Sequence, residues 1–174
     1  MSEPDDEYWA FSTRLRYEEE WSTREDVFKA HGYNFRPRLR KGWTPSWLTT
    51  GESPLHSEDG EASRVRRPSD RWFPMLILLQ NKLVDAYTDD GKLVFVKRVG
   101  RNDEESRIAQ MLTTEELRED PRNHCVPIIE VFDDPDDDSI SYLVMPLLRN
   151  ASDPAFQYVK EIIDFVNQVL EVGH

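Results

Sequence analysis

The stretch that decides the fold is KLVFVKRVGRNDEESRIAQML, from Lys92 to Leu112. Its first half alternates as a strand does, with Leu93, Phe95 and Lys97 on one face and Val94, Val96 and Arg98 on the other. Its second half begins at Asn102 or Asp103 and has Ile108, Met111 and Leu112 at helical spacing. The stretch therefore predicts a strand followed by a capped amphipathic helix. We expect Lys97 to face inward with the bulky apolar residues of its strand.

Further strands are predicted on both sides of this stretch. Before it, PMLILLQ (74–80) and KLVDAYT (82–88) are strand-like, and DDG (89–91) forms a hairpin turn. After it come a polar helical turn near TEELRED (114–120) and two strands, within VPIIEVFDD (126–134) and SISYLVMPLL (139–148), joined by the turn PDDD. The fold class is therefore α+β, with a twisted antiparallel sheet of about five strands and one helix.

The segments on either side of the predicted sheet have different sequence patterns. Residues 1–48 are predicted to form a helical N-terminal extension, with a break near Ser22, whose spacing to Glu25 is that of a capping box. Trp43 and Trp47 are expected at the edge of a core. Residues 49–71 lack periodicity, which predicts a mobile linker. The predicted strands lie in residues 72–150. Residues 151–174 are predicted to form a solitary C-terminal helix with an apolar stripe.

The composition excludes several kinds of partner. The chain has 22 basic and 34 acidic residues, so its net charge is −12, which disfavours nucleic acid and anionic membrane surfaces. No apolar run approaches the roughly 20 residues of a spanning helix. Cys125 is the only cysteine and the four histidines are scattered, so we expect no disulfide and no metal site. We expect an intracellular protein, in the cytoplasm or nucleus.

The order of these motifs resembles the small lobe of a protein kinase. A strand ending V-x-V-K, a helix with glutamate soon after, and a last strand ending YLVMPLL carry the resemblance. More closely, FRPRLRKGWTPSWL, DPRNHCVPIIEVF and LVMPLL resemble a fungal-type protein kinase-like family that has a helical extension before the lobe. The resemblance implies that Lys97 and Glu105 form the nucleotide clamp. It also places Met145 at the gatekeeper position and Leu147 in the hinge.

Departures from the family pattern predict a loss of catalysis. The segment LILLQNKLV (76–84) has no glycine where a kinase has its Gly-rich loop, and Phe95 replaces the small residue that leaves room for adenine. No H-R-D, D-F-G or A-P-E sequence occurs, and the chain ends at His174 in what resembles the first helix of the large lobe. We therefore expect a truncated kinase-like domain that is inactive alone and holds no cofactor.

Three functions stay open at this stage. The leading hypothesis is a pseudokinase-like module that binds a protein partner, or itself, through the C-terminal helix. The alternative is a small lobe of a Ser/Thr protein kinase that is completed by a large lobe in trans or lost from the gene model. A third is a small α+β binding domain without kinase ancestry.

Overall fold

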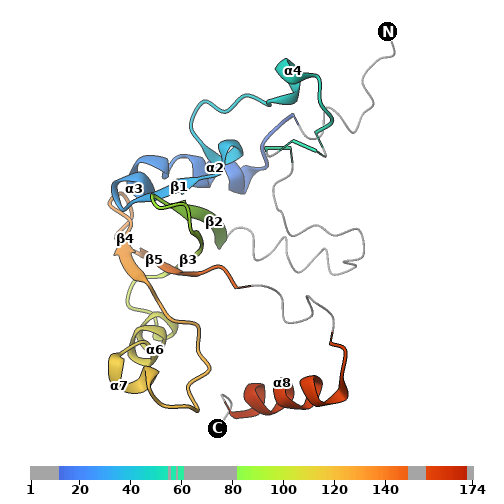
Figure 1. Ribbon diagram of the computed structural model, residues 1–174. Helices are drawn as coiled ribbons and strands as arrows, with labels where there is room; N and C mark the ends of the chain where they lie inside the picture. The colour runs from blue at the N-terminus through green and yellow to red at the C-terminus, as the bar shows by residue number, and fades with distance from the viewer. Residues whose placement is uncertain (1–11, 55, 58, 61–81, 149–155, 172–174) are drawn as a thin grey trace. The chain divides into compact units, whose positions relative to one another are not determined.

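The computed structural model describes residues 12–54, 56–57, 59–60, 82–148 and 156–171. These residues form an α+β fold with six α-helices and a five-stranded antiparallel sheet of strand order β1-β2-β3-β5-β4 (Figure 1). The α+β class and the five strands are thus confirmed. The chain divides into two compact units, residues 1–93 and 94–174.

The first unit begins with two short helices. Its elements are α2 (Arg16–Ser22), α3 (Glu25–Ala30), β1 (Tyr33–Phe35), the 3-10 helix η1 (Pro37–Leu39), α4 (Trp47–Thr50) and β2 (Leu83–Thr88). The predicted break near residue 22 is confirmed. The predicted capping box is wrong, because the N-cap of α3 is Arg24 and no side chain caps it. Gly32, just after α3, has a φ of +79°, a conformation that glycine adopts without strain.

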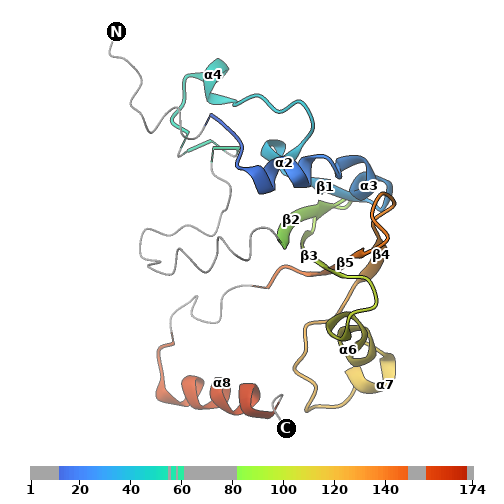
Figure 2. The ribbon, with the colours of Figure 1, turned by 180° about the vertical axis from the view of Figure 1, so that it is seen from behind.

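Three aromatic rings form the centre of this first unit. Trp21 of α2, Phe28 of α3 and Phe35 of β1 are at most 1% exposed, and the Phe28 and Phe35 ring centroids lie 4.7 Å apart. Both ribbon views show α3 beside β1 (Figures 1 and 2). Trp47 is also fully buried, as its expected place at a core edge requires. Burial of such large rings supplies most of the drive that folds a unit of this size.

Strand β1 was missed by the sequence prediction. It pairs antiparallel with β2, with Tyr33 opposite Thr88 and Phe35 opposite Ala86. Strands β1 and β2 lie in the same compact unit, and the separate extension over residues 1–48 stays a prediction. The strand expected over residues 74–80 lies outside the described residues.

The second unit follows the predicted order closely. Its elements are β3 (Leu93–Gly100), α6 (Glu104–Leu112), α7 (Glu115–Arg118), β4 (Glu130–Asp133), β5 (Ile140–Pro146) and α8 (Val159–Glu171). The predicted hairpin turn before β3 is confirmed by the hydrogen bond from the Gly91 amide to the Thr88 carbonyl, 2.9 Å long. Strand β5 is central, since it pairs with both β3 and β4.

The prediction for the faces of β3 is wrong in one respect. Val94 and Val96 are at most 2% exposed, whereas Phe95 on the opposite face is only half-buried and the Lys97 side chain is 28% exposed. Branched apolar side chains lose nothing by complete burial, whereas an ammonium group removed from water is costly. The valine face therefore carries the core of this strand, and Lys97 lies on the more open face.

We predict that Asp103 stabilises the second unit as the N-cap of α6. Its Oδ1 accepts a hydrogen bond from the Ser106 amide, 2.7 Å long. Asp103→Ala should cost about 1 kcal/mol in the free energy of unfolding, measured by urea denaturation. The control is Thr114→Ala, at the N-cap of α7, where no side-chain cap bond is formed. Equal losses in both variants would contradict the capping role.

Candidate functional site

The predicted pair of Lys97 and Glu105 forms in the second unit. Lys97, on β3, donates a hydrogen bond from Nζ to Oε1 of Glu105, in the first turn of α6. The two side chains are 28% and 55% exposed, so water weakens their attraction and the pair contributes at most about 1 kcal/mol. The Lys97–Glu105 pair therefore adds little to the stability of the fold. An ammonium has three N–H donors, so Lys97 keeps donors for a second anion.

Phe95 and Met145 lie beside this pair on the same face of the sheet. In the register of β3 and β5, Phe95 is opposite Met145 and Lys97 is opposite Leu143. Directly opposite residues in an antiparallel pair have neighbouring side chains, so a phenyl ring and a thioether meet next to the lysine. Leu147 follows the end of β5 and is 38% exposed. The sheet thus joins Lys97, Phe95 and Met145 on one face, with Leu147 beyond the strand end.

Other kinds of site are not found among the described residues. In the described ranges, no group of three or more His, Cys, Asp or Glu side chains is placed to hold a metal ion. No helix in the part of the chain that the structure describes is long and apolar enough to cross a membrane.

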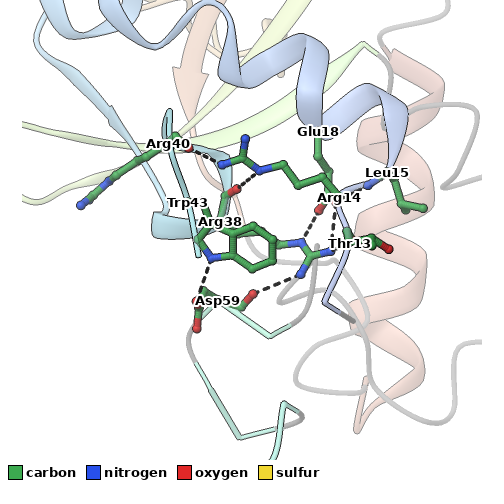
Figure 3. Close-up of polar contacts among 8 residues, drawn as sticks. All are labelled: Thr13, Arg14, Leu15, Glu18, Arg38, Arg40, Trp43 and Asp59. Carbon is green, nitrogen blue, oxygen red and sulfur yellow. Dashed lines mark hydrogen bonds and ion pairs between the residues drawn. The ribbon is translucent and has the colours of Figure 1, made fainter. Parts of the chain in front are cut away.

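A second polar cluster lies in the first unit, and the sequence analysis missed it. Arg38 of η1 and Glu18 of α2 form a two-pronged ion pair, with Nε 2.7 Å from Oε1 and the terminal nitrogen 3.1 Å from Oε2 (Figure 3). The two side chains are 4% and 0% exposed. Glu18 also accepts a hydrogen bond from the Leu15 amide, and Arg38 donates to the Thr13 carbonyl, each 2.8 Å long. The pair thus joins the start of α2 to η1, 20 residues further along the chain.

Trp43 extends this cluster to Asp59. The Arg38 guanidinium lies 4.7 Å from the centroid of the Trp43 ring, within cation–π range. The Trp43 indole N–H donates to Asp59 Oδ2 at 2.8 Å (Figure 3). The same carboxylate accepts a hydrogen bond from the Ser46 amide at 2.9 Å. We expected Asp59 in a mobile linker over 49–71, but it is only 4% exposed. Asp59 is therefore held by donors from the preceding segment, and the linker over 49–71 as a whole stays a prediction.

The environment of Asp59 lowers its pKa. Removal from water by itself raises the pKa of this carboxyl group, but the hydrogen bonds from Ser46 and Trp43 outweigh that effect. Asp59 is therefore held as a carboxylate in the folded unit. All the contacts described here join parts of one unit to each other, so the cluster acts as a structural clamp.

The sequence contains only a weak signal for this clamp. Glu18, Arg38 and Asp59 are charged residues in segments full of charge, and spacing alone does not distinguish the buried ones. Trp43 gives the better indication, because an indole N–H near a core usually finds a hydrogen-bond acceptor.

Comparison with protein families, with curated proteins and with solved structures finds no match to this chain.

We predict that the Glu18–Arg38 pair is the main polar support of the first unit. Glu18→Ala leaves a buried guanidinium without its counter-charge, so the free energy of unfolding should fall by roughly 3–5 kcal/mol. Urea denaturation followed by tryptophan fluorescence measures the change, since Trp21 and Trp47 are buried in this unit. The matched control is Glu19→Ala, an exposed neighbour on the same helix, which should change stability by less than about 0.5 kcal/mol. Similar losses for the two variants would contradict the clamp.

We also predict that Asp59 makes the first unit sensitive to acid. Because the pKa of this carboxyl group is lower in the folded chain than its ordinary value of 3.8, its contribution to stability is present above that value. The contribution is lost as the pH falls through the ordinary value and then through the folded pKa. The wild type should therefore lose more stability than Asp59→Asn between about pH 6 and pH 3. Parallel pH profiles for the two proteins would refute this assignment.

Proposed function

We propose that this chain is a kinase-like small lobe that acts without catalysis, by binding a protein partner. The observation that carries the proposal is the Lys97–Glu105 ion pair between a strand lysine and a helix glutamate. The same arrangement is the clamp implied by the resemblance to the fungal-type protein kinase-like family. The strand, helix and strand-pair order around it supports the same reading.

The surroundings of Lys97 support a non-catalytic role. Phe95 is at the position where the kinase family has a small residue that leaves space for adenine, and it faces Met145, at the gatekeeper position, across the strands. Admitting a ring there would require both to move, and overpacking costs roughly 1–3 kcal/mol. The segment 76–84 contains no glycine that would expose backbone N–H groups to phosphates. These 174 residues also contain no H-R-D or D-F-G sequence, so they supply neither the acceptor-orienting group nor the metal-holding groups of a kinase.

Helix α8 supports protein binding as the mode of action. Its apolar side chains are all exposed, and Val159 and Leu170 are 72% and 59% exposed. A contiguous apolar surface of this kind marks an interaction site. Because the chain has a net charge of −12, we propose a protein as the partner and neither nucleic acid nor an anionic membrane.

One observation favours the alternative function. The Lys97–Glu105 pair is already assembled, as an active small lobe requires. A large lobe supplied in trans would then complete a Ser/Thr protein kinase. Binding of nucleotide to the small lobe distinguishes this alternative from the leading proposal.

We predict that the chain does not bind Mg-ATP. In a thermal unfolding titration, a ligand at 100 times its Kd adds about 2.7 kcal/mol to the free energy of unfolding. We expect no such shift at millimolar ATP and magnesium. The control variant is Lys97→Met, which removes the clamp cation. A magnesium-dependent shift that is present in the wild type and absent from Lys97→Met would overturn the proposal and support the alternative.

A further inference from the structure

Helix α8 is exposed along its whole length. All seven of its apolar side chains are 41–72% exposed: Val159, Ile162, Ile163, Phe165, Val166, Val169 and Leu170. The start of the helix is capped by its own side chain, because Glu161 accepts a hydrogen bond from the Gln157 amide, 2.7 Å long. The helix therefore has a formed end and an uncovered apolar face.

The apolar and polar residues of α8 separate completely in a heptad frame. With Val159 at position a, every residue at a, d, e and g is apolar, and every residue at b, c and f is polar: Lys160, Glu161, Asp164, Asn167, Gln168 and Glu171. At 100° per residue the apolar arc spans about 160°. A two-stranded coiled coil covers the a and d positions, which span about half of this arc. To cover the whole apolar arc, α8 therefore needs a neighbouring helix on each of two sides.

The residues at positions a and d, which form the seam between packed helices, indicate how many helices associate. Positions a hold Val159 and Val166, and positions d hold Ile162 and Val169, so all four are β-branched. Two-stranded coiled coils are favoured by β-branched residues at a together with leucine at d, and α8 has no leucine at d. We propose that α8 packs with α8 of three further copies of this chain, in a four-helix bundle that buries positions a, d, e and g. This inference rests on the proposed function as a protein-binding module and names its partner as the chain itself.

The charges of α8 fit copies of the same helix better than a membrane. The chain carries a net charge of −12, yet no charged residue lies at positions a, d, e or g of α8. Identical helices can therefore meet without like charges in the seam. The polar arc has one lysine, Lys160, and three acids, Glu161, Asp164 and Glu171. Helices that lie on membranes have a polar face rich in Lys and Arg, which α8 lacks.

Light scattering after gel filtration of the whole chain tests the bundle. The wild type should have four times the chain mass of 20.5 kDa. Ile162→Asp with Val166→Asp puts charges into the seam and should give a single-chain mass. The matched control, Asn167→Asp with Gln168→Glu, adds the same two negative charges to positions b and c and should leave the assembly intact. Fluorescence of buried Trp21 and Trp47 checks that the first unit stays folded in each variant.

Several results would overturn the four-helix bundle: a wild-type monomer, dimer or trimer at the highest soluble concentration, an assembly that survives the seam variant, or dissociation of the control variant. Binding of a monomeric wild type to phosphatidylcholine vesicles would also overturn it. A monomer that binds no Mg-ATP would reject the bundle and leave the non-catalytic role in place. A tetramer that binds Mg-ATP through Lys97 would reject the non-catalytic role and keep the bundle.

Discussion

The first unit depends on the buried ion pair between Glu18 and Arg38. Taking both charges out of water is costly, and the attraction between them offsets that cost only where geometry and hydrogen bonding are nearly complete. Both conditions hold here, because two N–H···O contacts join the pair and the Leu15 amide and Thr13 carbonyl take part as well. The pair fixes η1 against α2, which in turn positions Trp43 for Asp59. A chain of contacts thus runs from residue 13 to residue 59 through one guanidinium.

The ion pair of the second unit has a different physical character. Lys97 and Glu105 are partly exposed, so solvent screens them and the fold gains little from their contact. Phe95 and Met145 beside the pair fill space with apolar groups.

The chain has a large net negative charge, and its second unit also exposes apolar side chains. The net charge of −12 keeps copies of the chain apart in general, while α8 and the half-exposed Ile108 and Met111 of α6 present apolar area to water. In α8 the charged residues all lie on one arc and the apolar residues on the other.

The sequence by itself determined the elements whose causes are local. The alternation over 93–100, the cap at Asp103, the turn through Gly91 and the helical stripe of α8 each depend on neighbours within a few residues, and each forms as predicted. The Lys97–Glu105 pair also forms, but it was expected from the resemblance to the kinase-like family and not from a local pattern. Only the tertiary structure decided the rest. Strand β1 has three residues, too few for a periodic pattern, and exists because β2, about 50 residues later, supplies its hydrogen bonds. Glu18, Arg38 and Asp59 are charged residues that become buried only when partners 13 to 21 residues away meet them, and no local pattern distinguishes them from solvated charges.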